Sequence, residues 1–181
     1  NIKYFSKVGD VDIHYLSGNT SKIFDTILFL TISEGDRFGT SVALNDDGTY
    51  LAVGAPNHDS QTGTTRIYNY SASTWSQVGS DIDGSATFDN SGTSVDISAD
   101  GTIVVIGSPN YDSGAFNANG GAKVYEYSSS TWSQLGSTIE GTANVDQLGS
   151  TVSISAVGTR IAIGIPGYGS TTGRVDMYDY S

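Results

Sequence analysis

The chain has 181 residues, 37% of them hydrophobic and 10% aromatic, which is the composition of a globular domain with a core rather than of a disordered tail. Eight Lys and Arg oppose nineteen Asp and Glu, and the formal net charge of −11 argues against a nucleic-acid partner. Without cysteine, disulfides and cysteine–metal sites are excluded. The most apolar run, 27–30, is far shorter than the roughly 20 residues of a membrane span, so we expect no membrane insertion.

Residues 4–12 (YFSKVGDVD) have the pattern of a strand that recurs later around Trp75 and Trp132, with Phe5 at the tryptophan position. We therefore predict that residues 1–13 contain the outer strand of a preceding or permuted repeat. Such a strand would complete the last repeat of the chain, within the same molecule or in a neighbour.

Residues 14–37 have no counterpart further along the chain, and we expect them to form an atypical linker. Within this segment, residues 23–32 (IFDTILFLTI) are apolar and β-prone. They would either cap an exposed sheet face or form an extra hairpin. The sequence leaves both alternatives open.

Three similar stretches follow, and they define the architecture. They read FGTSVALNDDGTYLAVGAP (38–56), SGTSVDISADGTIVVIGSP (91–109) and LGSTVSISAVGTRIAIGIP (148–166). Their glycines and prolines recur at spacings of 53 and then 57 residues, and a Tyr-x-Tyr pair follows each stretch. Repetition of this kind is typical of arrays of one supersecondary unit. We place the repeats at 38–90, 91–147 and 148–181, the last without a fourth strand of its own.

Each repeat is predicted to contain four short strands. Val42 and Leu44 alternate with polar neighbours, which indicates a first strand with unlike faces. A tight turn at 46–48 leads into a second strand that is apolar on both faces and must lie between two layers. The Tyr-x-Tyr pair marks the third strand. Trp75 and Trp132 mark the fourth, where we expect them to pack between neighbouring units.

Four antiparallel strands per unit, covered on both faces, fit the blades of a β-propeller. We therefore predict an all-β protein of about three four-stranded antiparallel blades. Three blades would leave two apolar faces uncovered, so the chain is expected to be part of a larger propeller or to be completed by oligomerisation. Self-association through open blade faces is accordingly one expected mode of partnership.

Phe38-Gly39 followed by Gly54-Ala55-Pro56 resembles the FG-GAP repeat, the blade unit of the propeller in integrin α-subunits. The patterns W-S-Q-[VL]-G and D-G-T are similar to a variant found in large surface proteins of marine microbes and microalgae. The resemblance covers about residues 38–181. It implies a secreted or cell-surface module for adhesion, protein–protein interaction or assembly, with protein or glycan partners.

Calcium-binding blades of the integrin type carry D-x-[DN]-x-D-G-x-x-D between the two halves of the repeat. The loops at Asp47-Gly48 and Asp100-Gly101 lack the full ligand set, because the last position is Leu51 in one and Val104 in the other. Calcium needs about six to eight oxygen ligands. We therefore expect no calcium, and no other metal or cofactor.

The sequence carries no recognisable catalytic motif, and we predict that the chain is not an enzyme. Its two histidines, His14 and His58, are too few for a His-based zinc site. We interpret His58-Asp59 as a solvated surface pair. The segment 167–173 (GYGSTTG) lacks the spacing of a nucleotide-binding loop.

Recognition is expected in the loops that join the second and third strands, because these loops differ most between the repeats. The candidate ligand-binding residues in them are Asp59, Tyr111, Asp112, Phe116 and Tyr168.

Two alternative functions remain open. One is a carbohydrate-binding propeller, in which Trp75 and Trp132 or the 110–120 loop contact sugars. The other is a structural subunit of a filament or shell. In addition, Asn19 and Asn69 lie in N-x-[ST] sequons and are candidate glycosylation sites.

Overall fold

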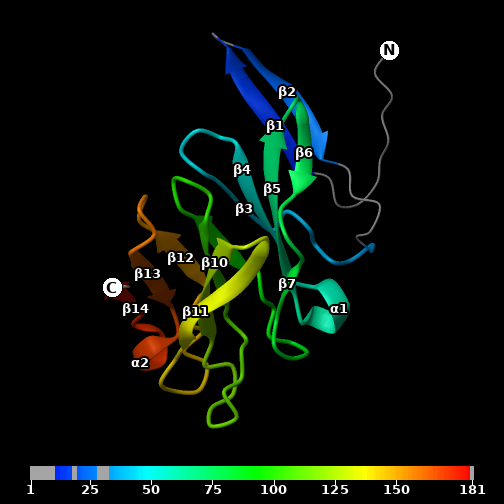
Figure 1. Ribbon diagram of the computed structural model, residues 1–181. Helices are drawn as coiled ribbons and strands as arrows, with labels where there is room; N and C mark the ends of the chain where they lie inside the picture. The colour runs from blue at the N-terminus through cyan, green and yellow to red at the C-terminus, as the bar shows by residue number, and fades with distance from the viewer. Residues whose placement is uncertain (1–10, 18–19, 28–32, 180–181) are drawn as a thin grey trace.

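The computed structural model describes residues 11–17, 20–27 and 33–179. β-strands dominate it, and two helices of one turn each lie in loops (Figure 1). The strands are β1 (Val11–Ser17), β2 (Thr20–Ile27), β3 (Ser41–Leu44), β4 (Tyr50–Ala55), β5 (Thr64–Ser71), β6 (Thr74–Gln77), β7 (Ile82–Asp83), β8 (Ser94–Ile97), β9 (Ile103–Ser108), β10 (Gly121–Ser128), β11 (Thr131–Glu140), β12 (Thr151–Ile154), β13 (Arg160–Ile165) and β14 (Arg174–Asp179). The helices are α1 (His58–Gln61) and α2 (Tyr168–Thr171).

Three antiparallel sheets correspond to the three repeats. Their strand orders are β3-β4-β5-β6, β8-β9-β10-β11 and β12-β13-β14, and β7 also pairs with β5. The first hairpin of each sheet has the same turn, in which a glycine at positive φ donates its backbone N–H to the residue three positions earlier. These glycines are Gly48, Gly101 and Gly158. The predicted all-β fold built from antiparallel repeats is confirmed.

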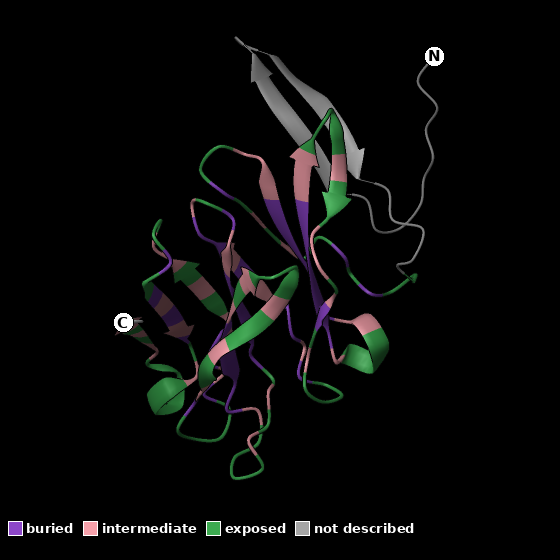
Figure 2. Ribbon diagram, viewed as in Figure 1, coloured by how far each residue is buried: buried purple, intermediate pink, exposed green. Residues whose placement is uncertain are grey.

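The hydrophobic core lies between consecutive sheets, which we call blades. The cluster between the first two blades consists of Ala52, Ile67, Ile82, Val95, Ile97, Val104 and Ile106. The cluster between the second and third consists of Val105, Ala122, Val124, Leu148, Ile161, Ile163 and Ile165. Figure 2 shows these buried segments at the centres of the sheets. Because alternate residues of a strand point to opposite faces, the central strands contribute to the clusters on both sides.

Polar contacts also join the blades near their first strands, β3, β8 and β12, which contact one another in that order. The Ser41 hydroxyl donates to the carbonyl oxygen of Gly92 at 2.7 Å, and the Ser94 hydroxyl donates to that of Gly149, also at 2.7 Å. The serine thus holds the glycine of the next repeat in both interfaces.

The N-terminal part of the chain forms a separate two-stranded sheet in which β1 pairs with β2. Residues 23–27 belong to β2, which agrees with the extra-hairpin alternative for that part. The predicted boundary between the outer strand (1–13) and the linker (14–37) falls inside β1, since the pairing of β1 with β2 continues to Ser17. The predicted strand at 4–12 lies outside the described residues except for its last two positions, which begin β1. The predicted boundaries of the three repeats stay predictions.

Candidate functional site

Loops from all three blades form one continuous edge, which we call the rim. It consists of residues 57–61, 84–90, 109–119, 141–147 and 166–173 and lies at the lower end of the sheets in Figure 1. Hydrogen bonds join each loop to the next along the edge. They are Asn90 N to Gln61 O (2.9 Å), Asn110 Nδ2 to Asn90 Oδ1 (2.7 Å), Val145 N to Asn117 O (3.0 Å) and Gly167 N to Asp146 O (3.0 Å).

A buried aspartate organises the turn that precedes each blade. Asp36 Oδ2 accepts from Ser33 N at 3.0 Å, Asp89 Oδ2 from Ala86 N at 2.9 Å, and Asp146 Oδ2 from Thr142 N and Ala143 N at 2.8 and 2.9 Å. Burial raises the pKa of Asp89, although the backbone hydrogen bonds oppose this effect. Each of these carboxylates accepts hydrogen bonds from backbone N–H groups of its own turn, so the repeated aspartate stabilises the turn.

The residue before each of these aspartates has a left-handed backbone. Gly35, Phe88 and Val145 have φ of 100°, 71° and 56°. Only glycine adopts this region freely, and a bulky or β-branched residue there is strained. Nevertheless, the side chains of Phe88 and Val145 are 61% and 59% exposed. The turns before the second and third blades therefore present large apolar side chains to solvent, at a conformational cost that the turn before the first blade avoids.

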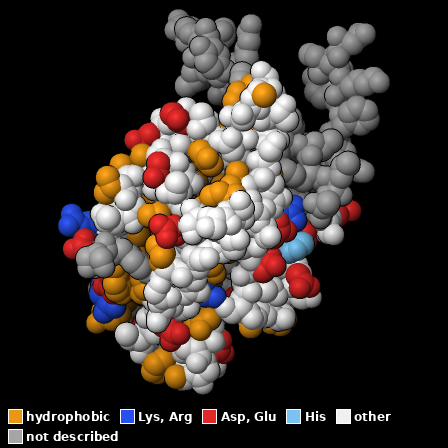
Figure 3. Space-filling model, viewed as in Figure 1, with side chains coloured by type: hydrophobic (Ala, Val, Ile, Leu, Met, Phe, Trp, Pro, Cys, Tyr) orange, Lys and Arg blue, Asp and Glu red, His pale blue; other side chains and the backbone are white. Residues whose placement is uncertain are grey.

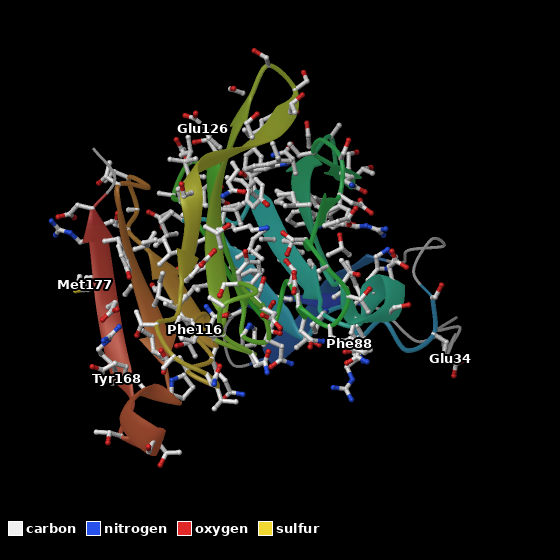
Figure 4. The ribbon with its side chains drawn as sticks, turned by 90° about the horizontal axis from the view of Figure 1, so that it is seen from below. Glu34, Phe88, Phe116, Glu126, Tyr168 and Met177 are labelled. Carbon is white, nitrogen blue, oxygen red and sulfur yellow. The ribbon has the colours of Figure 1, made fainter. Side chains whose placement is uncertain are left out.

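Two of the three predicted aromatic residues are exposed on the same rim. Phe116 is exposed and lies one residue before Asn117, whose carbonyl oxygen accepts from Val145. Tyr168 is exposed at the start of α2, with the Arg174 guanidinium 4.0 Å from its ring centroid. Figure 4 shows Phe88, Phe116 and Tyr168 along one edge of the molecule.

The other three predicted residues have more local surroundings. Asp59 is exposed in α1, and Asp112 Oδ1 accepts from Gly114 N at 2.8 Å within its own loop. Tyr111 is partly buried, and its hydroxyl donates to Glu140 Oε1 at 3.2 Å. Burial, reinforced by the charge of Glu140, raises the pKa of Tyr111. All five predicted residues therefore lie on the rim, and Phe116 and Tyr168 share with Phe88 and Val145 an exposed side chain. The sequence does contain a signal for Phe88 and Val145. When the repeated aspartates are aligned, both residues stand at the position of Gly35, so a large apolar residue replaces a glycine.

The histidine of α1 does not form the surface pair that the sequence suggested. His58 Nδ1 lies 2.8 Å from Asp36 Oδ2, and Asp36 is buried. This correction follows from the fold, because the turn at 33–36 packs beside α1. An ion pair joins the buried Arg66 to Asp81, with Nη2 and Oδ2 2.7 Å apart, and Gln77 Nε2 donates to the other oxygen of Asp81 at 2.7 Å.

The aspartates of the hairpin turns bind neighbouring groups. Asp47 Oδ1 accepts from the backbone N–H and hydroxyl of Thr49, and Asp100 Oδ1 accepts from Thr102 in the same way. These hydrogen bonds lower the pKa of Asp47. In the part of the chain that the structure describes, no group of three or more acidic, His or Cys side chains is arranged to hold a metal. The expectation of no calcium stays a prediction.

Trp75 and Trp132 lie against the core. Trp132 packs against the cluster between the first two blades, and its Nε1 donates to the Val78 carbonyl oxygen of the preceding blade at 2.8 Å. Trp75 packs against a cluster on the other face of the first blade, which contains Phe38, Leu51 and Val53. The contact of Trp132 is the packing between units that we expected.

One of the two sequon asparagines, Asn69, lies in the described part of the chain, on β5. Asn69 is partly buried, and its Nδ2 donates to the Thr49 carbonyl oxygen at 3.2 Å, a bond that a glycan on this nitrogen would have to replace. Asn19 lies outside the described residues. Glycosylation at either asparagine stays a prediction.

Residues 32–68 match the model of the FG-GAP repeat, so the expected resemblance is confirmed. No curated protein matches the chain significantly. Similar solved structures include the periplasmic gluconolactonase of Pseudomonas aeruginosa, with 13% identity over 93% of this chain and 46% of that chain and a TM-score of 0.60. TolB of Acinetobacter baumannii has 15% identity over 91% of this chain and 33% of that chain, with a TM-score of 0.51. The hydrazine synthase of Kuenenia stuttgartiensis has 16% identity over 77% of this chain and 33% of that chain, with a TM-score of 0.50.

These structural neighbours are β-propeller proteins, and the chain therefore has the β-propeller fold with an FG-GAP repeat in its first blade. It spans only 33% to 46% of the length of these three neighbours, which fits a partial propeller. The resemblance to the variant of marine surface proteins stays a prediction. Neither helix within residues 11–17, 20–27 and 33–179 is long and apolar enough to cross a membrane.

The comparisons contradict the prediction that the chain is not an enzyme. The neighbours include a gluconolactonase and a hydrazine synthase, so the propeller fold is compatible with catalysis. The prediction relied on the absence of contiguous motifs, whereas a propeller can bring catalytic groups together from separate blades. At identities of 13% and 16%, the likeness shows the fold alone and assigns no reaction to this chain.

Proposed function

We propose that the chain is a protein-interaction module of a secreted or cell-surface protein and that it binds its partner through the rim. The observation that carries the proposal is the exposure of Phe88 and Val145 on left-handed backbone. Each strained residue costs on the order of 1–3 kcal/mol, and such cost concentrates at functional positions. Adhesion or assembly is the role that fits a rigid frame of this kind.

The chemistry of the rim favours a protein partner with apolar and basic groups side by side. Phe88, Phe116 and Tyr168 supply exposed aromatic rings, which are enriched at protein interfaces. Asp59 and Asp112 are exposed on loops of the same rim, and the whole chain carries a net charge of −11. Figure 3 shows hydrophobic and acidic side chains close together at the lower end of the molecule. A secreted or surface location is proposed because FG-GAP repeats are typically extracellular.

The proposal is tested with a random dodecapeptide library displayed on phage and selected on the immobilised chain. Peptides rich in basic and aromatic residues should be enriched, and their affinity should fall about tenfold or more on the double variant Phe88→Gly and Val145→Gly. Glycine suits the backbone at both positions, so the variant should fold. Val157→Asp, at an exposed position in the turn between β12 and β13 and away from the rim, is the matched control and should bind normally. A library that yields no binder, or binders indifferent to the double variant, would overturn the proposal.

A further inference from the structure

The two outer faces of the blade stack differ from the interfaces within it. Each blade has a face that points toward the end of the stack, which we call its trailing face, and in the first two blades the next blade covers it. In the first blade it contains Ala52, Thr65 and Ile67, which are all buried. The corresponding residues of the third blade are Ala162, Val175 and Met177. Val175 and Met177 are 68% and 66% exposed, and Figure 4 shows Met177 pointing away from the other blades.

A specific socket accompanies each covered trailing face. A Cβ on Gly54 would lie 2.0 Å from the carbonyl oxygen of Gly92, and a Cβ on Gly107 would lie 2.0 Å from that of Gly149. Both carbonyl groups therefore rest directly on the glycine of the preceding blade. Each also accepts the serine hydroxyl described above, from Ser41 or Ser94, so glycine and serine together form the socket.

The third blade retains this socket without an occupant from the described chain. Gly164 takes the place of Gly54 and Gly107, and Thr151 takes the place of the serine. Among the described residues, the three atoms nearest to a Cβ on Gly164 would all belong to Thr151. A hollow of about 400 Å³ opens here, lined by Thr151, Gly164, Pro166, Arg174 and Val175 among others.

The first blade carries the group that fits this socket. Gly39 corresponds to Gly92 and Gly149, and the three have φ of 88°, 84° and 87°. All three donate their backbone N–H to the corresponding glycine carbonyl of their own blade. Gly92 and Gly149 are buried, whereas Gly39 is exposed.

The apolar residues beside Gly39 match the exposed residues of the third blade. Val42 and Leu44 are 53% and 51% exposed, whereas their counterparts Val95 and Ile97 pack in the core between the first two blades. The edge formed by Gly39, Val42 and Leu44 is thus the counterpart of the inner part of the surface that covers a trailing face. The outer part, Leu51 and Val53 in place of Val104 and Ile106, is already buried in the first blade's own cluster.

We propose that the third blade binds the first blade of a second copy of this chain, head to tail, with the Gly39 carbonyl in the socket of Thr151 and Gly164. The Thr151 hydroxyl donates to that carbonyl, as Ser41 and Ser94 do within the chain. Val42 and Leu44 of the second copy cover Val175 and Met177. A contact of this type uses two different surfaces, so it either closes into a ring or grows into a filament. It does not depend on the rim.

Light scattering after size-exclusion chromatography, over a concentration series, tests this interface. The wild-type chain should associate as its concentration rises. Met177→Asp and Leu44→Asp, which alter exposed positions on the two opposite surfaces, should each weaken association about tenfold or more. Val175→Asp is a second variant on the third blade and should act like Met177→Asp. Phe88→Gly on the rim is the control and should associate normally.

Mixing the two single-surface variants distinguishes head-to-tail binding from a symmetric dimer. Met177→Asp retains an intact first blade, and Leu44→Asp retains an intact third blade. Their equimolar mixture should therefore form a 1:1 complex that grows no further, although neither variant associates alone. A wild-type chain that stays monomeric would overturn the proposal. So would association that either variant leaves unchanged, or a mixture that remains monomeric.

Discussion

The hydroxyl of Ser94 donates a 2.7 Å hydrogen bond to the carbonyl oxygen of Gly149, which belongs to the next blade. The carbonyl can approach this closely because Gly107 has no Cβ beneath it. The same arrangement joins Ser41, Gly54 and Gly92 in the preceding interface. The repeated glycines of the sequence are therefore required by contacts between blades as well as by turns.

Gly107→Ala should destabilise the chain strongly. Its Cβ would lie 2.0 Å from the Gly149 carbonyl oxygen, which is backbone and cannot rotate away, so the blades would have to separate. Overpacking of this kind costs about 1–3 kcal/mol, and we expect the upper end of that range. Gly164→Ala is the matched control, because its new Cβ meets a threonine side chain that can change rotamer. Urea denaturation of both variants should show the larger loss for Gly107→Ala, and equal losses would contradict the assigned contact.

Trp132→Ala should lower the free energy of unfolding by about 3 kcal/mol, since it removes a large ring packed between blades and its bond to Val78. Trp132→Phe keeps most of the packing and loses the hydrogen bond, which is worth about 1 kcal/mol. Thermal and chemical denaturation measure both values. Thr131→Ala, at an exposed neighbour on the same strand, should have little effect. A small loss for Trp132→Ala would mean that the ring does not join the blades.

At acidic pH, the Arg66–Asp81 ion pair should contribute less to the free energy of unfolding. Partial burial would raise the pKa of Asp81, but the hydrogen bonds from Arg66 and Gln77 outweigh it and hold the pKa below its ordinary value. A carboxyl group with a lowered folded-state pKa stabilises the fold above its unfolded pKa of about 3.9, and this stabilisation is lost as the pH falls through the folded-state value.

The variant Asp81→Asn isolates this effect. At neutral pH the substitution should lower the free energy of unfolding by about 2 kcal/mol. This is less than the loss expected when a fully buried ion pair is broken, because Asp81 is partly exposed. The difference between the variant and the wild type should begin to shrink below about pH 4, and it should vanish as the pH falls through the lower folded-state pKa of Asp81. Unfolding free energies measured from pH 2 to pH 7 test this, and a difference independent of pH would refute the assigned role of the pair.

Phe88→Gly should stabilise the chain while it weakens partner binding. The phenyl ring is mostly exposed, so little packing is lost, and glycine relieves the left-handed strain at a φ of 71°. The gain should be up to about 1 kcal/mol, because glycine also raises the entropy of the unfolded chain. Gly35→Ala at the corresponding position should have the opposite effect and lose about 1 kcal/mol. A loss of stability for Phe88→Gly would show that the ring serves the fold.

Much of the blade architecture could be predicted from local patterns. Alternation at Val42 and Leu44 and the repeated turn glycines indicated the first hairpin of each blade, because alternating apolar residues and a tight turn are clear signals in a sequence, although Val42 and Leu44 themselves are exposed. The packing of Trp132 between units could be predicted as well. The short strand β7 was missed, since it pairs with β5 over two residues only.

The candidate site was harder to predict, because it depends on backbone conformation and on contacts distant in sequence. Phe88 and Val145 become notable only once their φ values and exposure are known. His58 pairs with Asp36, 22 residues away, although a carboxylate stands beside it in the sequence. The exclusion of catalysis was wrong because sequence motifs do not report on groups that separate blades bring together.

A crystal structure of the 181-residue chain tests the central claim, that its three repeats pack as consecutive blades, most directly. The distances to measure are from Ser41 Oγ to the Gly92 carbonyl oxygen and from Ser94 Oγ to the Gly149 carbonyl oxygen. Both should be hydrogen bonds close to the 2.7 Å found here. Blades that are separated, or joined through other residues, would contradict the account.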